Sequence, residues 1–256
     1  MLNKVKMSLY QQFDVINYDL DKPAIIYSNI QHEKMSLGGG TLVPMKYFLL
    51  ENGGIVIAAI PELKDFSLDF FQKYKHDLFS SETFAYLYEQ LPEKIKKLKM
   101  KLFLGNDEKE KYRLKYGLED KNLVKTKQIL NSTIKLNPNI NYVNNTIAYG
   151  KTLNRDRLHF GTVIDNEIVS IVGTNVEFFK FPATDPIEIG VETLLDFRKL
   201  GYATSNVRAM CEFLLKRGYS VTYNCHNKNI GSQKTALNCG FTQIAREKHL
   251  FCINDD

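Results

Sequence analysis

The feature that most constrains the fold is the stretch from Ile187 to Phe241, in which strand-like and helix-like segments alternate. They are, in order, the apolar run IEIGVET, the amphipathic segment TSNVRAMCEFLLKRG, the alternating run YSVTYNC and the shorter helical segment from about Ile230 to Cys239. Gly218 and Gly240 each follow a helical segment, as C-terminal capping glycines do. This alternation of strands and helices predicts an α/β architecture.

Apolar residues recur at helical spacing in the segment after Gly201. The apolar stripe comprises Ala203, Val207, Met210 and Leu214. The polar residues, which we expect elsewhere on the helix, are Asn206, Arg208, Glu212 and Lys216. The stripe predicts that one side of this helix packs on a core.

The chain before this region is predicted to be mixed α and β. HFGTVI and EIVSIVG flank Asp165-Asn166, which suits a tight hairpin turn. GIVIAAI, ended by Pro61, is strand-like, and SLDFFQKYKHDLF and SETFAYLYEQL both start at serine with helical spacing. Residues 91–127 are lysine-rich and polar, so we place a boundary near residue 120. We expect an α+β domain over residues 1–120, which would bind the acceptor, and an α/β domain over residues 121–256.

The bulk composition fits a soluble globular protein, with 256 residues, 44% hydrophobic and 25% charged. The net charge of +5 comes from dispersed lysines followed by acids, as in NDEKEKYRLKYGLEDK, which argues against a nucleic-acid partner. No signal-type segment or run of about 18 apolar residues is present, so we expect a cytoplasmic protein without a membrane partner. The four cysteines lack metal-ligand spacing, which predicts buried thiols and no metal site.

The residues RKLGYA stand between a predicted strand and a predicted helix. A helix starting near Leu200 presents unpaired N–H groups and the positive end of its dipole, which suits an anion. Gly201 allows close approach to the backbone, and Arg198 and Lys199 add positive charge. Taken alone, so short a pattern favours a glycine that simply opens the helix beside solvated cations. GxGxxG and the P-loop are absent, so neither a dinucleotide site nor an NTPase is indicated.

A second pattern lies downstream in NIGSQKTALNCGF, with Asn229, Ser232, Ala236, Gly240 and Phe241 at fixed offsets. Together with RxxGxA, this pattern resembles the GNAT superfamily of N-acetyltransferases over about residues 120–256. EIGVET with FRKLGYAT, and YNC followed by NxxS and CGF, are similar to the two-domain branch that includes the zwittermicin-resistance-type acetyltransferases. Members of that branch carry an additional N-terminal domain.

The resemblance implies a mixed sheet with helices on both faces, and acetyl-CoA bound where two parallel strands, residues 187–193 and 221–225, splay apart. Backbone groups around Val191 and Thr193 would hold the pantetheine arm. Asn229 and Ser232 would contact the cofactor. The residues expected around the pyrophosphate are Arg198, Lys199, Leu200, Gly201, Tyr202, Ala203 and Thr204. No metal is implied.

Acetyl transfer needs a base to deprotonate the amine. Strand alternation puts Glu188, Gly190 and Glu192 on one face, which we expect to border a polar cleft because two buried carboxylates are costly. Glu192 is our first candidate for base or amine anchor, and Glu188 is the reserve; a structural, ion-paired Glu192 stays open. Superfamily members often place an acid tyrosine where this chain has Ala236.

Because position 236 is an alanine, the proton donor is unassigned, with Tyr223, His226 or water as candidates. We expect direct transfer from acetyl-CoA to a primary amine, which the branch resemblance implies to be a small molecule. A covalent route through Cys225 or Cys239 is less simple, because no histidine has a determinable relation to them. Two alternatives are a protein or peptide N-acetyltransferase and a non-catalytic acyl-CoA-binding sensor.

Overall fold

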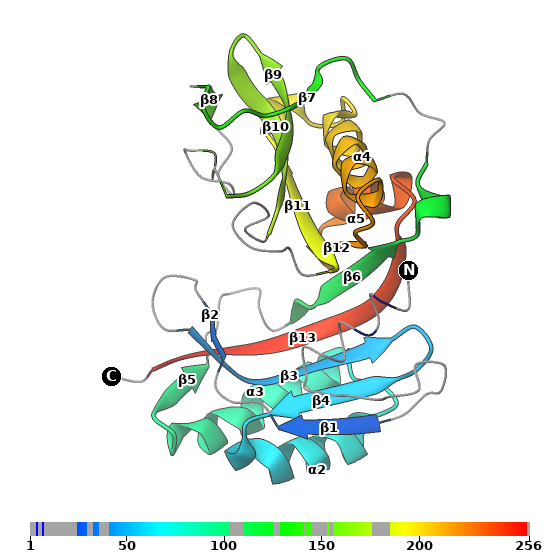
Figure 1. Ribbon diagram of the computed structural model, residues 1–256. Coiled ribbons are helices and arrows are strands. Elements are labelled where there is room, and N and C mark those ends of the chain that lie inside the picture. The colour runs from blue at the N-terminus through cyan, green and yellow to red at the C-terminus, as the bar shows by residue number, and fades with distance from the viewer. Residues whose placement is uncertain are drawn as a thin grey trace. The chain divides into compact units, whose positions relative to one another are not determined.

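The computed structural model describes Lys4, Met7 and residues 25–29, 33–35, 41–102, 110–124, 129–140, 142–144, 153, 156–175 and 185–254 (Figure 1). These residues belong to two compact units. One unit, called the C-terminal unit, contains residues 1–8, 115–225 and 229–243. The other, called the N-terminal unit, contains residues 9–114, 226–228 and 244–256. The predicted domains 1–120 and 121–256 stay a prediction.

The C-terminal unit is built on a mixed sheet with the strand order β6-β12-β11-β10-β9-β7, and β8 pairs with β10. Its strands are β6 (Arg113–Leu118), β7 (Thr133–Lys135), β8 (Val143–Asn144), β9 (His159–Ile164), β10 (Glu167–Thr174), β11 (Ile187–Thr193) and β12 (Val221–His226). β10 is antiparallel to both β9 and β11, whereas β8 is parallel to β10 and β12 is parallel to β11. The predicted α/β class is therefore confirmed.

The described residues of this unit also form two α-helices and short 3-10 turns. They are α4 (Tyr202–Leu215), α5 (Ile230–Asn238), η3 (Asp120–Asn122) and η4 (Leu195–Phe197). α4 packs along β7, β9, β10 and β11 and also touches α5. α4 and α5 follow β11 and β12 respectively, so the predicted alternation of strand and helix is observed.

The N-terminal unit has the strand order β1-β4-β3-β13, with β2 beside β3 and β5 beside β13. The strands are β1 (Ile25–Asn29), β2 (Glu33–Met35), β3 (Thr41–Leu50), β4 (Ile55–Ala59), β5 (Met100–Leu102) and β13 (Thr242–Asn254). After η1 (Pro61–Leu63), α2 (Lys64–Tyr74) packs against β4, and α3 (Ser81–Lys96) packs against β5 (Figure 1). β6, β12 and β13 have residues in both units.

Several local predictions are confirmed and others are wrong. Asp165 and Asn166 have φ of 48° and 63° and form the expected tight turn between β9 and β10. α2 begins at Lys64, not at serine; the Ser67 hydroxyl instead donates to the Lys64 carbonyl (2.7 Å) inside the first turn. Ser80 caps α3 by accepting from the Thr83 N–H (3.1 Å). The lysine-rich stretch was predicted to be polar, but it contains the strand β6, which is buried along almost all of its length.

The stripe on α4 is only part of its buried surface. Val207, Met210 and Leu214 are fully buried as predicted, but Asn206 and Arg208 are buried too, at 0% and 3% exposed. Asn206 can be buried because side chains of the sheet form hydrogen bonds with its amide. Its Nδ2 donates to the Ser170 hydroxyl (3.0 Å), and its Oδ1 accepts from the Thr162 hydroxyl (3.2 Å). The prediction that these polar residues lie away from the core is therefore wrong.

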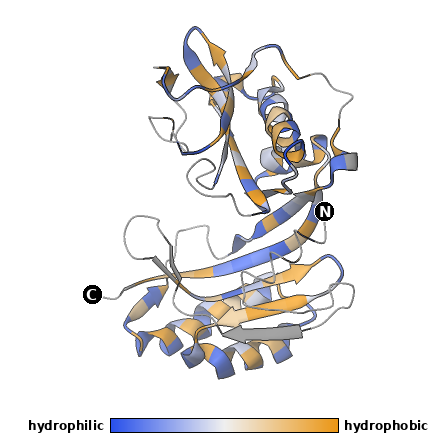
Figure 2. Cartoon of the chain, in the orientation of Figure 1, coloured by the Kyte–Doolittle hydropathy of each residue, from blue (hydrophilic) through white to orange (hydrophobic). Residues whose placement is uncertain are grey.

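In the N-terminal unit, the middle of β13 is hydrophilic between more hydrophobic ends (Figure 2). Two of its cations lie over aromatic rings: the Arg246 guanidinium is 5.2 Å from the Phe79 ring centre, and the Lys248 ammonium is 4.9 Å from that of Phe84. The Lys248 ammonium also donates to the Lys111 carbonyl (2.6 Å). Lys248 is only 2% exposed, and these contacts compensate its charge.

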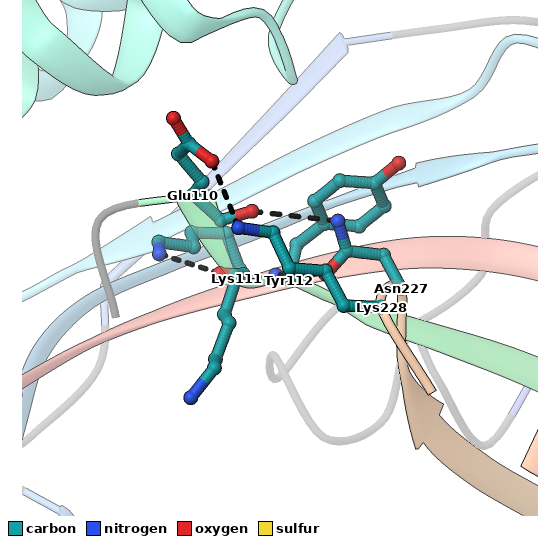
Figure 3. Close-up of polar contacts among 6 residues, drawn as sticks. Glu110, Lys111, Tyr112, Asn227 and Lys228 are labelled. Atoms are coloured by element: carbon teal, nitrogen blue, oxygen red, sulfur yellow. Dashed lines mark hydrogen bonds and ion pairs between the residues drawn. The ribbon is translucent and has the colours of Figure 1, made fainter. Parts of the chain in front are cut away.

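The end of β12 is held by the segment before β6 within the same unit (Figure 3). The Tyr112 N–H donates to Asn227 Oδ1 (3.1 Å), and the Asn227 N–H donates to the Tyr112 carbonyl (2.9 Å). Lys228 and Glu110 add an ion pair of 2.8 Å, more than half exposed on both sides and therefore of small energetic weight. The reciprocal backbone and amide bonds are the firmer link.

Candidate functional site

Pairing between the two parallel strands ends before either strand does. The register pairs are Ile187 with Val221, Glu188 with Thr222 and Ile189 with Tyr223. β11 continues to Thr193 and β12 to His226, yet no further pair forms between these fully described strands. The two strands therefore separate over their last residues.

The separation leaves main-chain groups of β11 without a strand partner. The Ile187 N–H donates to the Ser220 carbonyl (2.9 Å), so the main-chain groups of this residue point toward β12. Because direction alternates along a strand, those of Val191 and Thr193 point the same way, beyond the last pair. The Thr193 carbonyl accepts from Arg198 Nε (3.0 Å). The Val191 groups and the Thr193 N–H are thus available for a ligand that inserts between the strands.

β11 is followed by the short turn η4 and then by the N-terminus of α4. After η4, Lys199 and Gly201 both have positive φ, of 64° and 89°, and the first helical bond runs from the Ser205 N–H to the Gly201 carbonyl (3.0 Å). The N–H groups of Tyr202, Ala203 and Thr204 precede that bond, so the helix itself provides them no acceptor. The predicted anion site at this turn thus has free donors and a glycine in the conformation that glycine favours.

The first turn of α4 is fixed from behind. The Ser205 hydroxyl accepts from the Leu130 N–H (2.8 Å) and lies 2.7 Å from the Thr133 hydroxyl. The Cys239 thiol, beyond α5, lies 3.5 Å from the Thr204 carbonyl. These contacts hold the N-terminus of the helix while Leu200, 57% exposed, faces solvent.

The motif residues at the start of α5 already form hydrogen bonds within the chain. The Asn229 side chain accepts from the Ser232 N–H (3.1 Å) and caps the helix, and the Ser232 hydroxyl lies 2.7 Å from the Tyr223 hydroxyl. Gly240 has φ of 94°, and a Cβ there would lie 1.8 Å from the Asn122 carbonyl oxygen. The NxxS and CGF patterns therefore have structural roles, whichever ligand contacts are added.

The carboxylates of β11 lie on the face away from α4. Ser170, whose hydroxyl contacts Asn206 of α4, is paired with Thr193, so Glu192, the next residue along the strand, faces the other side. Glu188 shares that face. Its Oε1 accepts from Asn175 Nδ2 (2.7 Å), and its Oε2 accepts from Asn224 Nδ2. Both oxygens of the reserve base candidate are thus already used as acceptors, whereas Glu192 remains the first candidate.

Position 236, the proton-donor candidate Tyr223 and the two candidate thiols are buried. Ala236 is 0% exposed, and Tyr223, 1% exposed, lies against Phe241 with ring centres 5.8 Å apart. Burial raises the pKa of the Tyr223 hydroxyl, although its hydrogen bond to Ser232 lowers it. Burial also raises the pKa of Cys225, and that of Cys239 to about 12. Neutral, buried thiols are poor nucleophiles, which agrees with direct transfer.

Other expected features are placed as follows. All four cysteines are free and buried, as predicted. His226 lies exposed at the end of β12, in the N-terminal unit. Across the described ranges, no group of three or more His, Cys, Asp or Glu side chains could hold a metal ion. None of the helices in those ranges combines the length and apolarity needed to cross a membrane.

No protein-family model matches the chain, and no curated protein sequence matches it. A GNAT-family protein from Novosphingobium aromaticivorans is 15% identical over 62% of this chain and 69% of that chain, with a TM-score of 0.46. A GNAT-family acetyltransferase from Colwellia psychrerythraea is 15% identical over 59% of this chain and 56% of that chain, at 0.43. A GCN5-related N-acetyltransferase from Sphaerobacter thermophilus is 8% identical over 85% and 82%, at 0.44. The function must therefore be argued from the site's own residues.

Sequence reasoning missed two residues of this site, Asn175 and Asn224, which hold Glu188. Asn224 Oδ1 is buried and has no hydrogen-bond partner in the part of the chain that the structure describes. The alternation of YSVTYNC places Asn224 on a strand, but its contact with a residue 36 positions away gives no signal in the sequence. The end of strand pairing beside it gives none either.

Proposed function

We propose that the protein is an N-acetyltransferase that moves an acetyl group from acetyl-CoA directly to a primary amine, and that the acceptor is a small molecule. The observation that carries the proposal is the end of β11–β12 pairing after Ile189 and Tyr223, at the strand that leads into the donor-rich N-terminus of α4. An elongated ligand could lie between the separated strands and place an anionic end at the N-terminus of α4. The GNAT pattern RxxGxA followed by NxxSxxxAxxxGF falls on these same elements.

In this proposal, the pyrophosphate accepts from the backbone amides of the turn Arg198–Ala203, with Thr204 beside it. The pantetheine arm lies between β11 and β12 and uses the free main-chain groups of Val191 and Thr193. Asn229 and Ser232 contact the cofactor from the first turn of α5. Because most donors are main-chain groups, the shape of the turn matters more than the identity of Lys199, Leu200 or Tyr202.

The reaction is a direct displacement. The neutral amine attacks the thioester carbonyl carbon, the C–S bond breaks, and the electron pair leaves with the CoA sulfur. Glu192 takes the proton that the amine loses. With Ala236 at the usual tyrosine position, the thiolate leaves without help from α5, and water protonates it.

The test combines binding and turnover. Acetyl-CoA should raise the melting temperature, because a ligand selective for the folded state stabilises it. CoA thiol should appear with a panel of amines and peptides, and Glu192→Gln should slow release by about 10²-fold or more while acetyl-CoA still binds. Glu212→Gln, which removes a partly exposed 3.8 Å ion pair with Lys216, is the matched control.

Each failure has a separate meaning. No stabilisation by acetyl-CoA removes the proposal as a whole. Tight binding of CoA without turnover of any acceptor supports the acyl-CoA-binding sensor, and turnover with peptides alone supports a peptide acetyltransferase. Full activity in Glu192→Gln removes the base assignment and leaves the rest standing.

A further inference from the structure

The Arg198 side chain forms a hydrogen bond with the end of β11. Its Nε donates to the carbonyl oxygen of Thr193 (3.0 Å), and its main-chain N–H donates to the carbonyl of Leu195 (3.2 Å). Thr193 is the last residue of β11, and Arg198 directly follows η4. The side chain therefore spans η4 and joins the strand proposed for the pantetheine arm to the turn proposed for the pyrophosphate.

The carbonyl that Arg198 holds lies on the edge of β11 that faces away from β10. Thr193 is paired with Ser170 of β10. The next bond between these strands runs from the Leu194 N–H to the Val169 carbonyl (3.0 Å). Because main-chain groups alternate between the two edges of a strand, those of Thr193 point away from β10. Pairing of β11 with β12 ends before this residue, so Arg198 provides the donor that a strand partner would otherwise give.

The turn that Arg198 begins contains unfavourable backbone conformations. Lys199 has φ of 64°, and Gly201 has φ of 89°. The left-handed region is unfavourable for a residue with a Cβ, and such residues persist only where the surrounding structure holds them. None of the side chains of η4 is buried, so apolar packing contributes little to holding this turn. The Arg198 side chain restrains it from the strand side, as the Ser205 hydroxyl does from the helix side.

The positive charge of Arg198 is the alternative explanation for this residue beside an anion. The residue is exposed, however, and solvent weakens the attraction between an exposed cation and a phosphate. The backbone donors at the start of α4 bind an anion together only if the turn places them together. Holding that turn is therefore the larger contribution that Arg198 can make.

We propose that Arg198 is a positioning residue of the cofactor site: through Nε it fixes the end of β11 against the turn before α4, so that one acetyl-CoA molecule contacts both. Its positive charge is not required. The inference rests on the proposed function and deepens it, because it identifies what keeps the two halves of the cofactor site in register. It also predicts which replacements of Arg198 the site tolerates.

Two substitutions separate the hydrogen bond from the charge. In Arg198→Gln, the side-chain Nε2 is as many bonds from Cα as Nε of arginine is, so the donor is kept and the charge is lost. Arg198→Lys keeps the charge but has a carbon atom at that position. In calorimetric titrations, the dissociation constant of acetyl-CoA should stay within about twofold of wild type in Arg198→Gln. It should rise about five- to tenfold in Arg198→Lys, which is the loss of one hydrogen bond.

Arg217 provides the matched control at the other end of α4. It is also exposed, and its guanidinium also donates to a main-chain carbonyl, that of Phe213 (3.2 Å). Arg217→Gln and Arg217→Lys should both bind acetyl-CoA like the wild type, because this bond does not hold the turn before the helix.

A second ligand distinguishes positioning from a general loss of stability. Adenosine 3′,5′-bisphosphate carries phosphates but no pantetheine arm, so it should contact the turn alone. Its affinity should fall less in Arg198→Lys than that of acetyl-CoA, which must fit the turn and the strand at once. A lower melting temperature with unchanged dissociation constants for both ligands would show a structural role only and would overturn the inference.

The outcomes separate the inference from the proposed function. Affinity for acetyl-CoA that is kept in Arg198→Lys and lost in Arg198→Gln assigns the role to the charge and overturns the inference, as does an equal effect, or none, in both. If the wild type does not bind acetyl-CoA, the proposed function fails, and inorganic pyrophosphate is titrated while the amide resonances of Tyr202, Ala203 and Thr204 are followed. Shifts in the wild type and Arg198→Gln that are weaker in Arg198→Lys support the positioning role; any other order, or no shift, refutes it.

Discussion

Gly201 and Gly218 lie at opposite ends of α4 in nearly the same backbone conformation, with φ of 89° and 81°. A Cβ at Gly201 would meet only Leu130 Cδ1, at 4.0 Å, and a Cβ at Gly218 would meet nothing within 4 Å. Alanine at either position therefore introduces backbone strain without a steric clash. Comparing the two alanine variants separates the loss of stability caused by backbone strain from any loss of ligand affinity.

The stability cost should be the same in both variants. A non-glycine residue in the left-handed region costs about 1–2 kcal/mol, which corresponds to a fall in melting temperature of roughly 2–8 °C for a protein of this size. Acetyl-CoA binding should respond differently. Gly201→Ala places a methyl group at the turn proposed for the pyrophosphate, and the loss of one charge-assisted hydrogen bond corresponds to about 10–100-fold in affinity.

Differential scanning fluorimetry measures the stability of each variant, and calorimetric titration with acetyl-CoA measures the affinity. Equal melting temperatures with weakened binding in Gly201→Ala alone are the expected result. The reasoning is refuted if Gly201→Ala binds acetyl-CoA like the wild type. It is equally refuted if Gly218→Ala, at the far end of the helix, loses as much affinity.

Three further predictions follow from buried groups. Burial, and then Arg157, lower the pKa of His159 from about 6.5 to about 4, so acid protonates the unfolded chain first. The free energy of unfolding should fall by up to about 3 kcal/mol between pH 6.5 and 4, and His159→Gln should lack this component in urea titrations. Asn206→Leu should lose about 2–5 kcal/mol of stability because its sheet partners stay buried and unpaired, against less than about 0.5 for Glu212→Gln. Cys225→Ala should keep its rate of thiol release; a 10²-fold loss with intact acetyl-CoA binding would point to a covalent intermediate.

Periodicity predicted the elements of the C-terminal unit because their patterns are local. Spacing along the chain determines the stripe of Val207 and Met210 and the shared face of Glu188 and Glu192, and all of these are observed. Asn206 was assigned away from the core because a polar residue is normally exposed. Its burial depends on hydroxyls of β9 and β10, 36 to 44 residues away, which no local pattern reveals.

The candidate site could be predicted only where a motif encodes backbone shape. RxxGxA correctly indicated a glycine at the start of a helix, which the structure shows with φ of 89°, and its ligand stays a prediction. The end of pairing between β11 and β12 depends on how two distant segments diverge, so the sequence is silent about it. The same is true of the unused Oδ1 of Asn224, which follows from that divergence and from the position of Glu188.

The burial of Ala236 affects the chemistry as well as the packing. A tyrosine at this position would need space for a ring where Ala236 is fully enclosed. Tyr223 of β12 has its hydroxyl beside Ser232 and is itself buried. Position 236 of α5 therefore provides no proton donor. In the proposed reaction, water therefore protonates the leaving thiolate, and Glu192 on β11 takes the proton of the amine.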